Sequence, residues 1–434
     1  MRLRYKIQGS EVFGVSARLT LILIVGLPLL AAGCGRPEAE FVYNERTENL
    51  MREAQEGMAV ERDGKPVKLS GLKQAIEDNF GTPQHLVAWL RLPVDYGGLE
   101  GTKTDEQGGS LVGKQKPGYR LKEGRRLFMT HCLHCHGVSG DGNGPTAKYL
   151  NPLPRDYRLG LFKFTSTGRA DKALRGDLAR IVKQGIPGTY MPSFMLLEKE
   201  ELKAIVEYVR WLAMRGELEN KLDAELTGDY SQEAFKQRKD DGEDPAEIKQ
   251  ELAAYLADEF PENIDTTATD LAKVWGVVEK ENRVVVPKKK RNVNDAASRA
   301  RGRALFLAGK TKCIACHGIT GRGNGPRTED FEKMPGTDEE YPEPGLFDNW
   351  GNSIKPRNLT TGIYRGGRRP IDIYRRIYAG IKGTPMAPFG GTILNDDEIW
   401  DLVNYVMSIP YQKQGVTSQD GANEVAAGTG GRKR

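Results

Sequence analysis

The chain has 434 residues, of which 38% are hydrophobic and 28% are charged, a composition that predicts a soluble globular protein with two or three domains. A short basic run at residues 288–291 has no aromatic residue among its four charges. We therefore interpret it as a solvated segment and exclude a nucleic-acid partner.

The start of the chain has the three regions of an export signal. Basic residues are followed by an apolar stretch at 19–32 and by small residues before Cys34. At about 1.5 Å per residue the stretch spans roughly 21 Å, less than the ~30 Å hydrocarbon core of a bilayer. We therefore expect residues 1–33 to be a signal peptide and not a membrane-spanning helix.

The sequence before Cys34, Leu-Ala-Ala-Gly-Cys, resembles a bacterial lipobox, in which the cysteine becomes the lipidated first residue of the mature protein. It departs from that motif at Ala31, where leucine is more common. We expect a lipid anchor through Cys34 on the periplasmic side of a bacterial membrane. The alternatives are an ordinary signal cut nearby and an uncleaved anchor.

Residues 34–115 are expected to form a spacer with short helices. Residues 38–61 are polar and charged, which is typical of a mobile segment. Residues 69–91 contain two helix-like pieces separated at Gly81-Thr82-Pro83. In the second piece His85 and Trp89 would share one face, and we expect them to pack onto the next domain.

Two C-x-x-C-H runs dominate the rest of the chain. They comprise Cys132, Cys135 and His136, then Cys313, Cys316 and His317. This is the attachment pattern of a c-type haem, since two thiols on one helical turn can each add to a vinyl group while the histidine lies beneath the iron. The pattern predicts two covalently bound haem c groups.

Other uses of these cysteines fit the sequence less well. The pairs of a zinc ribbon usually lie about 15 to 20 residues apart, far closer than these two, and a thioredoxin-like pair needs no following histidine. Of the five cysteines only Cys34 remains after haem attachment. No disulfide framework is expected.

Both haem units repeat further segments in the same order. A G-R-x-L-F face precedes each run, at 124–128 and 302–306, and a G-x-G-N-G-P loop follows it, at 140–145 and 321–326. Each unit closes with an amphipathic helix, around 200–209 and 397–406. We expect Phe128 to pack on Tyr208, and Phe306 on Tyr405, where the first and last helices cross.

A methionine recurs at one position of each repeat. The pattern G-I-x-G-T-x-M ends at Met191 and at Met386. A lone methionine is usually a core residue, but repetition in register favours a ligand. A thioether favours ferrous iron and raises the reduction potential of a haem. We therefore expect Met191 and Met386 to be the sixth ligands.

The arrangement resembles the class I cytochrome c fold over residues 116–216 and 295–412. The resemblance implies a mainly α protein with two helical haem domains, histidine–methionine ligation and one-electron transfer. It also implies that the carbonyl of a proline after each motif accepts the N–H of the proximal histidine. The positions for this role are Pro145 and Pro326.

Two arginines form a further pair, since each lies between the G-x-G-N-G-P loop and the repeated methionine of its own unit. Arg155 and Arg357 follow a proline in both units, and a guanidinium matches a carboxylate well. We expect them to pair with haem propionates, in which case replacing either with glutamine lowers the potential of its own haem. An ordinary solvated arginine is the alternative.

The remaining segments connect or extend the units. Residues 217–294 are expected to be a linker with helices near 247–260 and 270–280. The second unit carries an insertion at 327–350, which we interpret as a surface loop. Residues 413–434 are expected to be a disordered tail.

Charge is distributed unevenly among these segments. Residues 116–216 hold 18 Lys and Arg against 9 Asp and Glu, whereas the linker holds 12 against 19. A basic face on the first unit would steer an acidic redox partner, unless the acidic linker covers it.

These features predict a diheme electron carrier and not an enzyme, because protein and porphyrin together supply all six ligands of each iron. It would relay electrons between a respiratory donor and a terminal oxidase or reductase. One alternative is a diheme cytochrome c peroxidase, which needs a vacant iron; only His85 could replace Met191. Another is a fixed subunit of a larger respiratory complex.

Overall fold

The computed structural model describes residues 38–55, 60–62, 65–67, 71–100, 114–335 and 337–412. The expected signal peptide, Cys34 and the tail from residue 413 lie outside the described residues. The chain divides into two compact parts, 1–40 and 41–434, and the text below concerns the second. It is mainly α-helical, as the sequence predicted, and no helix in the described ranges is long and apolar enough to cross a membrane.

The N-terminal region packs onto the first haem unit through its aromatic residues. Phe41 and Phe80 are buried, and their rings lie 5.9 and 5.4 Å from Trp211. The elements of this region are α2 (Glu45–Gln55), β1 (Val60–Arg62), β2 (Lys65–Val67), α3 (Gly71–Phe80), β3 (Ala88–Trp89), β4 (Leu99–Glu100) and β5 (Lys114–Pro117). Residues 41–50 therefore belong partly to a core, which the polar composition of 38–61 did not predict.

Only the first of the two helix-like pieces at 69–91 is a helix. After α3 the chain turns back at Gly81, whose φ is +76°, and continues into β3. In β3 Trp89 pairs with Lys114 of β5 in an antiparallel three-stranded sheet of order β3-β5-β4. This pairing with a distant segment overrides local helix propensity. Trp89 is buried as expected, but His85 is exposed.

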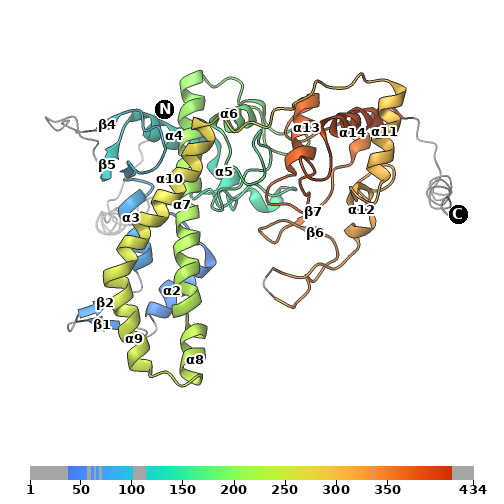
Figure 1. The fold of residues 1–434 in the computed structure, drawn as a ribbon. Helices are drawn as coiled ribbons and strands as arrows, with labels where there is room; N and C mark the ends of the chain where they lie inside the picture. Colours follow the sequence, from blue (N-terminus) through green and yellow to red (C-terminus); the bar gives the residue numbers. More distant parts are fainter. Residues whose placement is uncertain are drawn as a thin grey trace, which may run out of the picture. The chain divides into compact units, whose positions relative to one another are not determined.

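The two haem units are built on the same pair of crossing helices (Figure 1). Gly124 and Gly302 lie where α4 crosses α7 and where α11 crosses α14; a Cβ on either would lie 2.1 Å from a backbone carbonyl oxygen of the facing helix. The elements of the first unit are α4 (Tyr119–His131), α5 (Leu133–His136), η1 (Ala147–Tyr149), α6 (Arg175–Gln184) and α7 (Lys199–Tyr230). Those of the second are α11 (Ala296–Leu307), α12 (Cys313–His317), η3 (Pro326–Thr328), β6 (Leu346–Phe347), β7 (Ser353–Ile354), η4 (Leu359–Thr361), α13 (Pro370–Ala379), α14 (Asp396–Ser408) and η5 (Ile409–Tyr411).

The expected aromatic contacts at the crossings are present. The rings of Phe128 and Tyr208 lie 5.3 Å apart at 56°, and those of Phe306 and Tyr405 lie 5.4 Å apart at 58°. All four side chains are buried. The missing Cβ of each glycine lets the helices approach closely enough for these rings to meet.

The segment between the units is helical and continues α7 beyond the boundary expected at residue 216. Its elements are α8 (Gln232–Asp240), α9 (Pro245–Ala254), a π-helical turn η2 (Tyr255–Glu259) and α10 (Phe260–Lys280). The two predicted helical stretches are thereby confirmed. α10 packs on α7 (Figure 1), and Trp275 donates from Nε1 to Glu217 at 3.0 Å.

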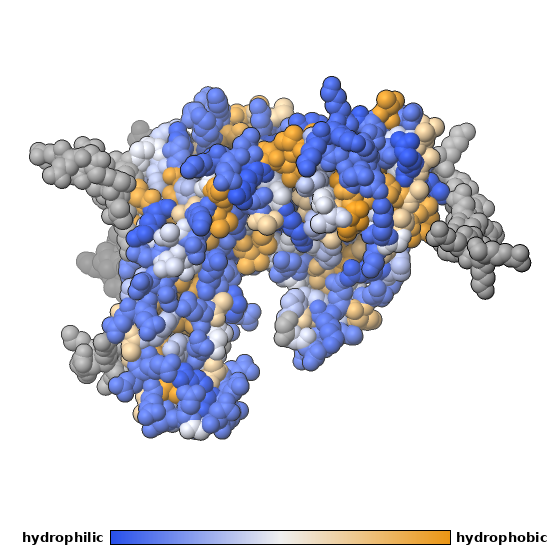
Figure 2. Space-filling model, viewed as in Figure 1, coloured by the Kyte–Doolittle hydropathy of each residue, from blue (hydrophilic) through white to orange (hydrophobic). Residues whose placement is uncertain are grey.

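Acidic side chains of this segment contact basic groups of the first unit. Glu279 accepts hydrogen bonds from Arg210 Nη1 at 3.1 Å and from the backbone N–H of Arg175 at 2.6 Å, and Glu217 accepts from Lys172 at 2.5 Å. Part of the basic charge is therefore covered by the linker. The surface seen in Figure 2 is largely hydrophilic, with hydrophobic residues in scattered groups.

The basic run at 288–291 also contacts protein and is not simply solvated. Lys289 forms an ion pair with Asp397, and Arg291 donates to Asn404 at 2.7 Å. Trp400 in turn donates from Nε1 to the Lys289 carbonyl at 3.0 Å. The acidic first turn of α14 thus fixes this segment against the second unit.

A buried carboxyl on α7 is expected to make the stability of the protein depend on pH. Burial raises the pKa of Asp223 to about 6, although Arg46 opposes the shift. Since the folded state binds this proton more tightly than the unfolded state, stability falls as pH rises from about 4 through about 6. Compared with Asp223→Asn, the wild type should lose up to about 3 kcal/mol over this window. Urea unfolding at several pH values measures this loss.

The control for this prediction is Asp229→Asn. Asp229 lies on the same helix and is exposed, so the variant should keep the pH dependence of the wild type. Equal pH dependence of wild type and Asp223→Asn would contradict the assignment.

Candidate functional site

Each C-x-x-C-H run forms a single helical turn. The backbone N–H of His136 donates to the Cys132 carbonyl at 2.9 Å, and the backbone N–H of Gly318 donates to the Ile314 carbonyl at the same distance. The two cysteines and the histidine of each run therefore lie on one helical turn. The four cysteines are unpaired and partly buried. Burial raises the pKa of the Cys132 thiol to about 12, which disfavours its thiolate. Two thiols on one turn can each form a thioether with the same porphyrin.

The two histidines have equivalent hydrogen-bond partners, and His136 is buried while His317 is partly buried. Nδ1 of His136 lies 3.2 Å from the backbone oxygen of Arg155, and Nδ1 of His317 lies 3.3 Å from that of Arg357. Because a carbonyl only accepts, Nδ1 carries the proton and Nε2 is left to bind a metal. Burial lowers the pKa of His136 to about 4 and also lowers that of His317, which favours the neutral form that can ligate.

These contacts differ from the expectation that Pro145 and Pro326 accept the histidine N–H. Both prolines are exposed. The backbone carbonyls of Arg155 and Arg357 accept the histidine N–H instead. This is possible because the glycine-rich loop of each unit folds against the segment that contains the arginine. A Cβ on Gly142 would lie 2.8 Å from the Pro154 oxygen, and one on Gly323 would lie 2.4 Å from the Pro356 oxygen. The glycines therefore position a carbonyl that lies much farther along the chain.

The side chains of Arg155 and Arg357 have different surroundings. The Arg155 guanidinium lies 3.8 Å from the ring centroid of Trp350, whereas Nε of Arg357 donates to the Ile363 carbonyl at 2.8 Å. Arg155 is mostly shielded from solvent, with a side chain 16% exposed. It is therefore not the solvated arginine considered as the alternative, and pairing with a propionate stays a prediction.

The two methionine loops have the same backbone arrangement. Ile186 donates its N–H to the Met191 carbonyl at 3.1 Å, and Ile381 does the same to Met386 at 3.1 Å. Within each loop a threonine hydroxyl accepts the methionine N–H, at 3.1 Å for Met191 and 3.3 Å for Met386. The sequence repeat is therefore a structural repeat, and both methionines are partly buried.

Several buried polar atoms lack a hydrogen-bond partner among the described residues. They include the hydroxyl of Tyr208, Nε1 of Trp350 and Nε of Arg365. A haem brings two carboxylates and fits such donors. Among the described side chains no group of three His, Cys, Asp or Glu is arranged to hold a metal ion, so the two cysteine pairs do not meet as a zinc site.

The comparison with protein families matches two segments, residues 121–213 and 299–410, to the family described as Cytochrome c. The chain contains two cytochrome c domains. Each carries a covalently bound haem c through its cysteine pair, Cys132 with Cys135 and Cys313 with Cys316. Electron transfer by haem is the shared chemistry of such domains.

One of the solved structures that this chain resembles is the Kuenenia stuttgartiensis reducing HAO-like protein complex Kustc0457/Kustc0458, with 24% identity and a TM-score of 0.45. The match covers 66% of this chain and 96% of that chain. Among curated proteins no match was found.

The sequence patterns did not identify the residues that join the two cytochrome c domains. Trp350 ends the insertion that we predicted to be a surface loop, and Arg169 donates to the Met386 carbonyl at 2.9 Å. A tryptophan in an insertion rich in proline and acidic residues was the available indication, since tryptophan is highly buried on average. Nothing in the sequence indicated Arg169, because one arginine in a basic domain carries no pattern.

Proposed function

We propose that this protein relays single electrons between redox proteins and does not transform a substrate. The observation that carries the proposal is the pair of methionine loops, each with the same hydrogen bonds around the methionine N–H and carbonyl. His136 with Met191, and His317 with Met386, would each hold one haem iron from two sides. A haem held in this way supplies reversible one-electron chemistry at a raised potential.

The chain's own residues would tune and protect this chemistry. The Arg155 and Arg357 carbonyls fix the tautomer of each histidine, which raises its basicity as a ligand. Tyr157 stacks on His136 at a centroid distance of 4.8 Å and limits rotation of the ring. Phe128 and Phe306, buried at the helix crossings, help exclude water from the domains.

The partners and the location follow from the sequence and belong to the proposal. We propose a respiratory donor and a terminal oxidase or reductase as acceptor, on the periplasmic side of a bacterial membrane, with anchoring through lipidated Cys34. The lipobox-like sequence supports the anchor. Metabolic labelling with a fatty acid, comparing the wild type with Cys34→Ala, tests it; equal labelling would contradict the proposal.

A redox titration of the purified holoprotein tests the relay function. We expect two fairly high potentials, a methionine–ferric charge-transfer band in the far red and no spectral change when carbon monoxide is added to the reduced protein. A haem that binds carbon monoxide readily would mean that one methionine is not a firm ligand. That result would overturn the proposal in favour of a peroxidase-like enzyme.

A further inference from the structure

The insertion of the second cytochrome c domain ends on the surface of the first domain. Arg155 of the first domain stacks on Trp350, and Lys163 donates to Asp348 at 3.4 Å. Asp348 is buried, and it accepts hydrogen bonds from the backbone N–H groups of Trp350 and Asn352 at 3.2 and 3.1 Å. A carboxylate thus fixes the turn that presents the tryptophan to the arginine.

Trp350 is also attached to the methionine loop of its own domain. The backbone N–H of Asn349 donates to the Gly383 carbonyl at 3.1 Å. A Cβ on Gly383 would lie 2.5 Å from the Trp350 ring, and the φ of this glycine is +69°. The ring therefore rests directly on the loop that ends at Met386.

Further contacts hold the methionine loops against the opposite domains. Arg169 donates to the carbonyls of Met386 and Thr384 at 2.9 and 3.2 Å, and Arg365 donates to the Gly188 carbonyl at 3.3 Å. Lys382, which is 5% exposed, donates to Thr167 Oγ1 at 2.8 Å. Each domain therefore contacts the methionine loop of the other.

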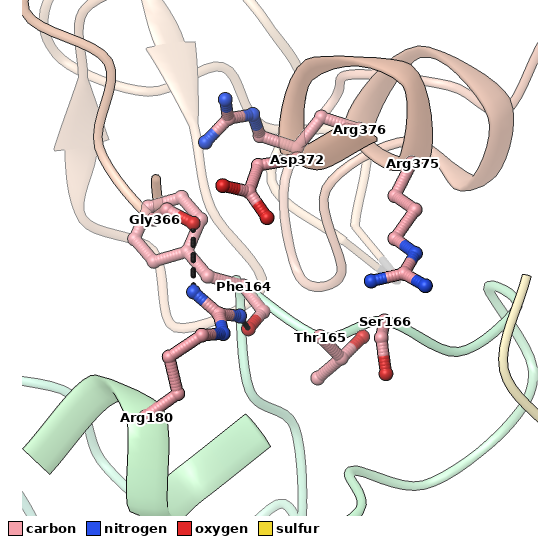
Figure 3. Close-up of a pocket in the computed structure, with 8 residues that line it drawn as sticks. All are labelled: Phe164, Thr165, Ser166, Arg180, Gly366, Asp372, Arg375 and Arg376. Atoms are coloured by element: carbon pink, nitrogen blue, oxygen red, sulfur yellow. Dashed lines mark hydrogen bonds between the residues drawn. The ribbon is translucent and has the colours of Figure 1, made fainter. Parts of the chain in front are cut away.

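A small pocket beside these contacts shows how tightly the domains meet (Figure 3). Arg180 of the first domain donates to the Gly366 carbonyl of the second at 2.9 Å and to the Phe164 carbonyl at 3.2 Å. The φ of Gly366 is +79°, and a Cβ there would lie 2.4 Å from the Phe164 ring. Backbone of one domain thus touches an aromatic ring of the other.

We propose that Trp350 is a positioning residue that couples the two haem sites, so that electrons pass between them within one chain. The contact sequence runs from His136 through the Arg155 carbonyl and guanidinium to Trp350, and from there to the Met386 loop. In the haem-loaded protein one haem would be oxidised and the other reduced by one electron, with no bond made or broken. This inference rests on the proposed relay function, and it gives the insertion at 327–350 a role that its polar composition did not suggest.

The test uses the holoprotein with Trp350→Ala, Trp350→Phe and Phe331→Ala. Phe331 lies in the same insertion and is 54% exposed, which makes it the matched control. After photoreduction of a small fraction of the haem, the phase that is independent of protein concentration reports transfer between the sites. Small-angle scattering and the two midpoint potentials provide readouts that do not depend on this rate.

Trp350→Ala should slow the concentration-independent phase by about tenfold or more, because transfer depends steeply on geometry, and should increase the radius of gyration. Trp350→Phe should retain most of the rate, since the face of a phenylalanine ring can still stack on the Arg155 guanidinium. Phe331→Ala should match the wild type. If Trp350→Ala does not fold, Arg155→Met removes the stack from the other side and should give the same slowing.

Wild-type rate and scattering in both Trp350→Ala and Arg155→Met would overturn the coupling role and leave the relay function intact. Failure of the relay function has a different signature. It would appear in the wild type as carbon monoxide binding, whereas a wild type that has firm methionine ligands but no concentration-independent phase would overturn the coupling alone.

Discussion

Replacing Met191 with alanine is expected to open the first haem, and only that haem, to carbon monoxide. With Met191 as the proposed sixth ligand, loss of the thioether would leave a vacant position on the iron and remove the ligand that favours its ferrous form, so the potential of that haem should fall by on the order of 100 mV or more within the ~0.8 V that axial ligands span. Met386→Ala should do the same to the second haem. Redox titration with carbon monoxide spectra measures both changes.

The loop of the first domain offers its own control. Met195 lies four residues after Met191 and is 66% exposed. Met195→Ala should leave both potentials and the carbon monoxide response unchanged. Equal effects of Met191→Ala and Met195→Ala would mean that the equivalent hydrogen bonds of the two loops do not mark a ligand.

Replacing Gly302 with alanine is expected to destabilise the second domain by about 2 kcal/mol or more, since overpacking costs typically 1 to 3 kcal/mol and sometimes more. The new Cβ would lie 2.1 Å from the Asp401 oxygen and 2.8 Å from the Tyr405 Cβ, so α11 and α14 must separate. Gly124→Ala should do the same in the first domain, where the facing oxygen belongs to Ala204. Urea unfolding followed at the haem absorbance measures both.

The same substitution at Gly176 separates crowding from helix propensity. Gly176 lies in α6 and nothing lies within 4 Å of its Cβ position. Gly176→Ala should therefore stabilise the protein by up to about 1 kcal/mol, because alanine is the better helix former. If Gly302→Ala behaved like Gly176→Ala, the close helix crossing would be contradicted.

Repetition explains why much of the site was predictable. Gly124 and Gly302 occupy equivalent positions in the two units, and so do the two methionine loops. When the same geometry requires the same residue in both units, the sequence shows that residue at two matching positions. The pairing of Phe128 with Tyr208 followed because both lie on amphipathic helices whose apolar faces must meet. The structure shows the contact at 5.3 Å.

The errors came from contacts that are far apart in the sequence. The carbonyl beside His136 belongs to Arg155 and not to Pro145, because the glycine loop folds back on residues that come later. Trp89 was assigned to a helix but lies in a strand whose partner starts at Lys114. In each case a distant segment supplied the hydrogen bond, and local pattern carries no information about such a partner.

The length of α7 decides how the first cytochrome c domain can unfold. With 32 residues at about 1.5 Å each, α7 is roughly 48 Å long. Its early turns contain Tyr208, which packs on Phe128 inside the first haem unit. Its later turns bury Leu218, Leu222 and Leu226 against other helices. Cutting the chain at residue 216 would expose that second apolar face. We therefore expect the haem-bearing part and the helices after it to melt as one cooperative unit, so that the absorbance of the first haem would report the integrity of a region far from its iron.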